Sequence, residues 1–274
     1  MNLLSPREML AGYAAAGAVK TRYPVWKMFL LGILAGLMIG LGAAVANTAA
    51  HNIADVGHAR LVMGLLFPFG LGIVVVTGME LFTGACLLPI SVLDGKASPA
   101  GMLKSWLFVY LGNFAGGLLV SSACVFAGQL GYSGNGLAAF TIRAAAAKCA
   151  LPFASALVSG IFCNLLVCMG VLMALAAQDV AGRIMGAYLP VAFFVICGFE
   201  HSVANMFYIP AGLLALEVPA YAAKAAELGV IVESLSWSRF FTANLLPVTL
   251  GNIIGGGGLA LIMWACHLRG SGKN

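Results

Sequence analysis

Four ionisable side chains lie in apolar parts of the sequence, and these residues could do chemistry. Glu80 and the adjacent Glu200 and His201 interrupt uncharged runs, and Lys148 stands alone among alanines and other small residues. If these runs cross a bilayer, a charge at its centre costs several kcal/mol, with estimates from ~2.5 to over 10. Each of these side chains therefore needs a structural or functional reason for its position.

His201 is the strongest candidate for function. Histidine changes its charge state easily near neutral pH, and in an apolar pore it could donate a hydrogen bond or a proton to a passing anion. The alternative is a core histidine whose ring is satisfied by a neighbour such as Asn164.

The two glutamates and the lysine each allow two interpretations. Two like carboxylates could form a proton relay. We favour a structural role, in which Glu80 and Glu200 accept backbone N–H groups that a broken helix leaves free, because lipid holds no water to do so. Lys148 either concentrates anions at a pore mouth or snorkels to the interface without further consequence.

Polar and apolar side chains near the same positions could shape a path for a solute. Thr83 lies close to Glu80, and a hydroxyl beside unwound backbone can orient a small polar solute. Phe67, Leu71 and Phe194 could form hydrophobic constrictions.

A different class of function is an intramembrane metal-dependent enzyme. Glu80, Glu200 and His201 would then be acid–base groups or metal ligands. No short ligand spacing in the sequence supports such a metal site.

The composition identifies the environment of these residues. Of the 274 residues, 62% are hydrophobic and 8% are charged, whereas a soluble domain carries roughly 25% charged residues. So few charges cannot cover a water-facing surface, and a disordered chain would be richer in polar residues. We therefore expect a polytopic membrane protein. The 14 Lys and Arg residues flank apolar blocks, which argues against a nucleic-acid partner.

Uncharged blocks divide the chain into six predicted spans, since about 20 residues are needed for each crossing. The blocks are 28–50, 61–93 interrupted at Glu80, 105–142 with a glycine-rich loop near 131–136, 149–178, 184–216 interrupted at Glu200, and 240–266. We expect a cytoplasmic amphipathic segment over 1–27, a transmembrane domain over 28–266 and a cytoplasmic tail over 267–274.

The second and fifth spans share an order of residues, as do the third and sixth. The second span contains Met63-Gly64, Pro68, Gly78, Glu80 and Pro89, and the fifth contains Met185-Gly186, Pro190, Gly198, Glu200 and Pro210 in the same order. The third span contains Gly112-Asn113 and Gly116-Gly117, and the sixth contains Gly251-Asn252 and Gly255-Gly256. A three-helix repeat must enter the membrane from the opposite face in its second copy. This predicts inverted repeats over about 28–125 and 150–266, with helices 2 and 5 broken at a midplane site. His201 has no counterpart in the first half, where Leu81 stands, and this asymmetry favours a functional role.

Basic residues set the expected orientation. With the N-terminus inside, nine Lys and Arg residues fall on the cytoplasmic side and five on the other, as the positive-inside rule favours. Six crossings also bring both termini to the same side. We therefore expect both termini in the cytoplasm.

Four motifs resemble signatures of the formate/nitrite transporter family. They are Gly78-Met79-Glu80-Leu81-Phe82-Thr83-Gly84, Gly198-Phe199-Glu200-His201-Ser202-Val203-Ala204-Asn205-Met206, Cys163-Asn164-Leu165-Leu166-Val167-Cys168 and Pro247-Val248-Thr249-Leu250-Gly251-Asn252. The resemblance spans nearly the whole chain. It implies an all-α, aquaporin-like protomer with six transmembrane helices, in a homopentamer in which each protomer has its own pore. It also implies the cytoplasmic (inner) membrane of a bacterium or archaeon.

The resemblance assigns roles by position. His201 is similar to the family's central pore histidine, and Thr83 to its partner on the loop that interrupts helix 2. Lys148 matches the vestibule lysine, and Asn164 and Asn252 match polar residues near the histidine. Leu81 and Phe82 correspond to the cytoplasmic constriction, Phe67 and Phe194 to the periplasmic one, and Leu71 also lines the pore.

Together these patterns predict a passive or proton-linked channel for small monovalent anions, formate first, and not an enzyme. The context of Phe199, Phe207, Ile209-Pro210 and Pro247 resembles the formate branch, while nitrite, hydrosulfide and lactate remain alternatives. The expected partners are the lipid bilayer, small anions and further copies of the chain, with no cofactor, metal or nucleic acid. A structural or receptor protein with a closed core would leave His201 and the matched breaks unexplained.

Overall fold

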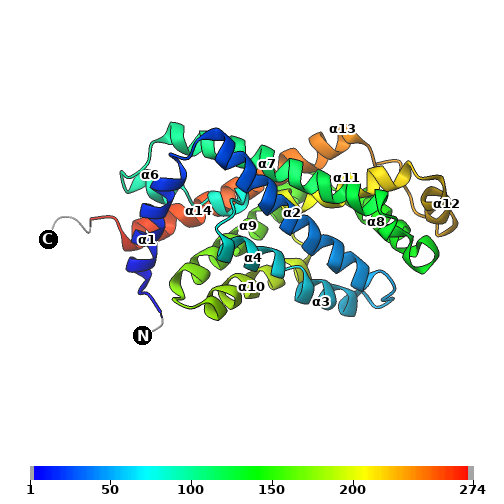
Figure 1. Cartoon of the computed structure of the whole chain (residues 1–274), viewed down its shortest axis with the longest axis horizontal. Helices are drawn as coiled ribbons and strands as arrows, with labels where there is room; N and C mark the ends of the chain where they lie inside the picture. Colours follow the sequence, from blue (N-terminus) through cyan, green and yellow to red (C-terminus); the bar gives the residue numbers. More distant parts are fainter. Residues whose placement is uncertain (1–2, 271–274) are drawn as a thin grey trace.

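The computed structural model describes residues 3–270 as a bundle of helices. Apart from one isolated β-bridge between Leu3 and Ala177, the regular structure of these residues is helical. Helix α1 and the C-terminal end of α14 lie at one end of the bundle, and α12 lies at the opposite end (Figure 1). The helices are α1 (Pro6–Lys20), α2 (Val25–Ala50), α3 (Val56–Leu66), α4 (Phe69–Thr77), α5 (Phe82–Ala85), α6 (Pro89–Leu93), α7 (Pro99–Phe126), η1 (Gln129–Gly131), α8 (Tyr132–Cys149), α9 (Phe153–Ala176), α10 (Val180–Cys197), α11 (Ser202–Leu216), α12 (Pro219–Glu227), α13 (Trp237–Arg239), η2 (Phe240–Leu245, a π-helical turn) and α14 (Leu246–His267).

Six spans in the described residues are long and apolar enough to cross a membrane, as the sequence predicts. Five are α2, α3 with α4, α7, α9 and α10, and the sixth runs from α13 through η2 into α14. Helices α11 and α12 meet at 98° and would add a seventh if the bent pair were one span. The exposed side chains of these helices include many large apolar residues, which suits contact with lipid.

The two predicted breaks are present and have the same backbone geometry. Helix α4 ends at Gly78 (φ 72°, ψ 27°), and α10 ends at Gly198 (φ 73°, ψ 28°). This left-handed conformation favours glycine, which has no Cβ to clash. The chain then extends through Leu81 in the first half and His201 in the second, and α5 and α11 begin at the following residues. This confirms that helices 2 and 5 are broken.

Each half begins with a helix that precedes its first span, and this helix was not predicted to belong to the repeat. Helix α1 ends at Lys20, four residues before Pro24 at the start of α2. In the second half Lys148 lies in the last turn of α8, four residues before Pro152 at the start of α9. Helices α1 and α8 therefore occupy equivalent places in the two halves.

The predicted glycine-rich loop near 131–136 is a non-helical kink at the start of α8. Three consecutive residues there, Ser133, Gly134 and Asn135, have left-handed backbone angles. The Ser133 hydroxyl accepts a hydrogen bond from the Asn52 amide (2.8 Å) and pairs with the His51 ring at 2.8 Å. These contacts join the start of α8 to the loop after α2.

Helix α1 covers one end of the bundle. Its first turn has a capping box, in which Ser5 and Glu8 exchange hydrogen bonds, and these bonds lower the pKa of the Glu8 carboxyl. Leu10 and Ala14 are fully buried, and the Tyr13 hydroxyl donates to the Gly84 carbonyl at 3.1 Å. The helix packs against α6, α9 and α14.

Small residues allow the long helices of each half to pack closely. A Cβ added to Gly32 of α2 would lie 2.8 Å from the Val109 carbonyl oxygen of α7. In the second half, a Cβ added to Gly160 of α9 would lie 2.8 Å from the Val248 carbonyl oxygen of α14. Close approach of this kind holds helices together in lipid, where burial of apolar surface gives no driving force.

We predict that Gly32→Ala and Gly160→Ala each lower the thermal unfolding temperature of the detergent-purified protein. The added methyl group meets a carbonyl that cannot move without shifting a helix, at a cost of about 1–3 kcal/mol. Gly257→Ala in α14 is the matched control, because nothing lies within 4 Å of its added Cβ. Equal unfolding temperatures for the three variants would contradict this packing.

Candidate functional site

One asparagine holds each helix break in place. The Asn113 side chain of α7 accepts from the Phe82 N–H (2.8 Å) and donates to the carbonyls of Gly32 (2.8 Å) and Glu80 (3.0 Å). Asn113 is fully buried. A single amide therefore satisfies polar backbone atoms on both sides of the first break.

The second break repeats this pattern with Asn252 of α14. Its side chain accepts from the Ser202 N–H (2.9 Å) and donates to the carbonyls of Gly160 (2.8 Å) and Glu200 (3.1 Å). The expectation that the glutamate side chains accept the freed backbone N–H groups is therefore wrong. An asparagine suits this place better, because its amide both donates and accepts, whereas an ionised carboxylate only accepts.

Glu80 and Glu200 instead form ion pairs with the matched lysines. Glu80 Oε1 lies 3.0 Å from Lys20 Nζ, and Glu200 Oε1 lies 2.7 Å from Lys148 Nζ. The other Glu200 oxygen accepts from the side-chain amides of Asn205 (2.7 Å) and Asn244 (3.2 Å). Each buried carboxylate is thus compensated, so the two glutamates lie in two separate networks.

His201 and Thr83 meet at the centre, one from each break. His201 Nε2 lies 3.0 Å from Thr83 Oγ1. The other ring nitrogen, Nδ1, accepts from the Ala204 backbone N–H at 2.9 Å. A nitrogen that accepts carries no proton, so the neutral ring must carry its proton on Nε2 and donate it to Thr83. The Thr83 hydroxyl proton is then free to point elsewhere.

Asn164 lies beside this pair. Its amide nitrogen donates to the carbonyls of Thr83 (3.2 Å) and Asn252 (2.7 Å). Its amide oxygen is buried and has no hydrogen-bond partner in the structure. The structure therefore brings His201, Thr83, Asn164 and Asn252 together, and the alternative that Asn164 satisfies the histidine ring directly finds no hydrogen bond to support it.

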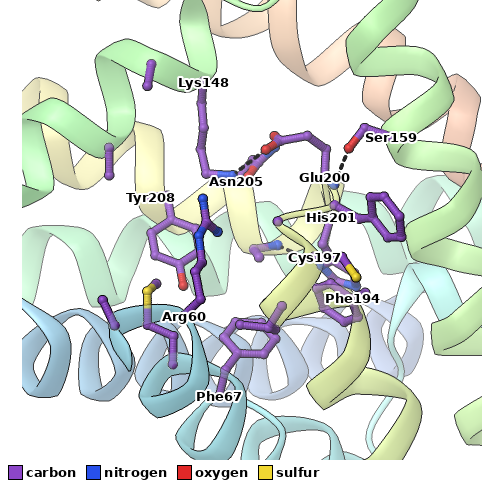
Figure 2. A pocket seen from close by; sticks show the side chains of 18 of the residues that line it. Arg60, Phe67, Lys148, Ser159, Phe194, Cys197, Glu200, His201, Asn205 and Tyr208 are labelled. Carbon is purple, nitrogen blue, oxygen red and sulfur yellow. Dashed lines mark hydrogen bonds and ion pairs between the residues drawn. The ribbon is translucent and has the colours of Figure 1, made fainter. Parts of the chain in front are cut away.

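A large cavity of about 1470 Å³, here called the outer cavity, reaches His201 from the side of the breaks away from α1. Phe67 and Phe194 line it with ring centroids 5.8 Å apart, and the Phe194 ring stacks on the His201 ring at 5.6 Å. Figure 2 shows the two phenylalanines beside His201, with Lys148 reaching Glu200 from the opposite wall. Phe67, Phe194 and Lys148 therefore lie along one route toward the histidine.

A small cavity of about 110 Å³ lies on the other side of the breaks. Leu71 and Leu81 line it, together with Lys20 and Glu80, and α1 covers it. No residue lines both cavities, and Thr83 between them is fully buried. The path is therefore closed in this conformation.

Phe82 lies outside both cavities, unlike the other residues expected at the constrictions. It is buried, with its ring 4.8 Å from Tyr110 and 6.2 Å from Trp106 between centroids. Its side chain thus packs among aromatic residues.

Four residues of these networks were not predicted from the sequence: Asn113, Lys20, Asn205 and Asn244. Asn113 was visible as the match of Asn252, and the shared spacing of Lys20 and Lys148 before a proline was a second available signal. Asn205 and Asn244 had no such signal, because they meet Glu200 only through the fold.

The described residues contain no group of three His, Cys, Asp or Glu side chains that could hold a metal ion. Glu80, Glu200 and His201, the ligands of the metal-dependent alternative, are engaged with Lys20, Lys148 and Thr83. The geometry therefore offers that alternative no support.

We predict that Lys148→Met strongly destabilises the protein and that Glu200→Gln in the same chain restores much of the loss. Removing one partner leaves a buried charge unpaired, at a cost of about 3–5 kcal/mol, whereas removing both leaves no charge. Glutamine can still accept from Asn205 and Asn244. The readout is thermal unfolding in detergent.

The matched pair gives the control for this experiment. Lys20→Met should cost less than Lys148→Met, because the Lys20 side chain is 37% exposed and that of Lys148 is 20% exposed. A double variant no more stable than Lys148→Met alone would refute the ion-pair account.

Comparisons with known proteins agree with this architecture. The formate/nitrite transporter family model matches residues 7–266. A probable formate transporter of Methanothermobacter thermautotrophicus is 34% identical, with 97% of each chain covered, and the formate channel FocA of Escherichia coli K12 is 35% identical over 98% of this chain and 96% of its own. A pentameric formate channel solved with formate bound has a TM-score of 0.78 at 34% identity, and the match covers 89% of this chain and 98% of that channel. An ion channel of the same family has a TM-score of 0.80 at 27% identity, and the match covers 94% of this chain and 98% of that one. The chain therefore belongs to the formate/nitrite transporter family, as a multi-pass membrane channel or transporter and not an enzyme.

Proposed function

We propose that this protein conducts formate across the membrane through a pore centred on His201 and Thr83. The observation that carries the proposal is the 3.0 Å contact between these side chains at the point where the path is closed. His201 lines the outer cavity together with Phe67 and Phe194, so a solute that enters this cavity reaches the pair there. The names of the relatives supply the choice of formate over nitrite, hydrosulfide and lactate.

His201 acts in this proposal as a neutral hydrogen-bond donor. Its Nδ1 accepts from Ala204, so a second ring proton could be added only if that bond broke. When Thr83 rotates away, Nε2–H can donate to a formate oxygen, and the Thr83 hydroxyl can donate to the other. These two bonds replace part of the water that an anion loses between the aromatic rings. A proton that travels with formate would then come from water and not from His201.

The other site residues take supporting roles. Asn164 and Asn252 fix the backbone around Thr83 and His201, and Asn164 offers its unpartnered amide oxygen to a protonated solute or a water molecule. Leu71 and Leu81 form the inner constriction, and Phe67 and Phe194 the outer one. For Phe82 we propose support of the inner constriction through Tyr110 and not direct contact with the solute.

The assembly and the topology follow from the same comparison. We propose a homopentamer, because a structural neighbour of this chain is a pentameric channel. We further propose a bacterial or archaeal inner membrane with both termini in the cytoplasm, since nine of the 14 basic residues fall on that side. The proposed domains are the segment 1–27, which includes α1, the channel domain 28–266 and the tail 267–274. Residues 1–2 and 271–274 lie outside the described residues, and so does Lys273, one of the nine basic residues expected on the cytoplasmic side.

The test is anion flux into proteoliposomes that hold the purified protein, with empty liposomes as the blank. We expect saturable formate uptake that exceeds uptake of nitrite, hydrosulfide and lactate under equal gradients at several pH values. Faster uptake of another anion of the panel would replace formate by that anion, and no uptake of any would contradict a channel.

We predict that His201→Phe reduces formate flux at least about tenfold, because the aromatic ring keeps the stacking on Phe194 but loses the donor. Monodisperse protein of unchanged unfolding temperature would show that the fold is intact. Formate flux at the wild-type rate and with the wild-type pH dependence would rule out a role for His201 in binding the anion.

A further inference from the structure

The outer cavity carries a positive charge that does not come from Lys148. The charged side chains that line it are Arg60, Arg143, Lys148 and Glu200. Lys148 is compensated, because Glu200 lies 2.7 Å away. Arg143 is partly engaged, as its guanidinium donates to the Leu228 carbonyl at 3.2 Å. Arg60 is exposed to the cavity, and no hydrogen bond or ion pair to it is present among the described residues.

The place of Arg60 is fixed by the second helix break. Its guanidinium lies over Gly198, where an added Cβ would come within 3.0 Å of Nη1, 3.2 Å of Cζ and 3.3 Å of Nη2. Gly198 precedes His201 by three residues, and the φ of 73° at Gly198 independently favours glycine. The guanidinium therefore sits against the backbone of the break that carries the central histidine, beside Tyr208 in the view of Figure 2.

The nearest acid along the chain does not neutralise Arg60. Asp55 caps α3 through the His58 N–H (2.8 Å) and lies 2.9 Å from the His58 ring. Glu200 lines the same cavity but is held by Lys148, Asn205 and Asn244. The Arg60 charge is thus left for a mobile anion.

A neutral group on the same wall also lacks a partner. Asn47 of α2 is 2% exposed, lines the outer cavity, and neither its amide nitrogen nor its amide oxygen has a hydrogen-bond partner in the structure. A buried amide without partners is costly unless a solute or water satisfies it. This second observation indicates that the outer cavity is built to hold a polar ligand.

We propose that Arg60 is the first binding partner of the permeating anion and that its planar fork makes the outer cavity prefer carboxylates over hydrosulfide. The inference deepens the proposed function and rests on it. A guanidinium binds a carboxylate through two parallel hydrogen bonds, whereas an ammonium offers a compact point charge that discriminates less. Hydrosulfide has one acceptor atom and cannot take two parallel hydrogen bonds from the fork. Lys148 then keeps Glu200 neutralised and contributes little net attraction.

The experiment compares three variants in proteoliposomes by initial rates of formate and hydrosulfide uptake. Arg60→Gln removes the charge, Arg60→Lys keeps the charge and removes the fork, and Arg22→Gln removes one positive charge from a residue that lines neither cavity. Formate binding to the detergent-purified proteins is measured in parallel, from the line broadening of ¹³C-formate.

We expect Arg60→Gln to raise the half-saturating formate concentration about tenfold. The maximal rate should be nearly unchanged, because the path is closed at His201 and Thr83 and not at Arg60. The increase should shrink at high salt. Arg60→Lys should keep hydrosulfide uptake while its formate preference falls several-fold, and Arg22→Gln should behave as the wild type.

Three results would overturn the inference: an unchanged half-saturation in Arg60→Gln, an unchanged formate preference in Arg60→Lys, or an equal shift in Arg22→Gln. Failure of the proposed function looks different. In that case the wild type would show no formate uptake. Line broadening of ¹³C-formate that depends on Arg60 would then still support the binding site at Arg60. Broadening that does not depend on Arg60 would overturn the inference.

Discussion

The structure depends on one constraint, that backbone N–H and C=O groups inside a bilayer must find partners within the protein. A transmembrane helix that breaks would leave several of them free. Here one buried asparagine at each break, Asn113 or Asn252, accepts from the N–H of the returning chain and donates to two carbonyls. The extended segments at Leu81 and His201 can exist only because of these amides.

The residues that we propose for function lie where the two halves differ on this shared scaffold. His201 stands where the first half has Leu81, and Thr83 stands where the second half has Val203. The backbone at the two breaks is nearly identical, so the scaffold does not require these differences. One half supplies a ring with an N–H, the other supplies a hydroxyl, and the two meet at 3.0 Å. The ion pairs of Lys20 with Glu80 and of Lys148 with Glu200 keep each carboxylate compensated on its own side.

The sequence predicted most of the fold, because the signals are local. Composition required a membrane, block lengths gave six spans, and Gly78 and Gly198 marked the breaks. The hydrogen-bond partners of the glutamates were predicted wrongly, because burial of a carboxylate beside a break did not reveal which side chain would reach the free N–H groups. Helix α8 was missed because its glycine-rich start has the composition of a loop. The place of Phe82 away from both cavities depends on the orientation of one side chain, which no spacing encodes.

We propose that formate passes through the contact between His201 and Thr83, and Thr83→Val tests this proposal most directly. Valine has nearly the same shape and already occupies the equivalent place, Val203, in the other half, so the variant should fold. The measurement is the initial rate of formate uptake into proteoliposomes beside the wild type. We expect the rate to fall about tenfold, the size of one hydrogen bond of ~1.4 kcal/mol. Uptake by well-folded Thr83→Val at the wild-type rate would contradict the claim.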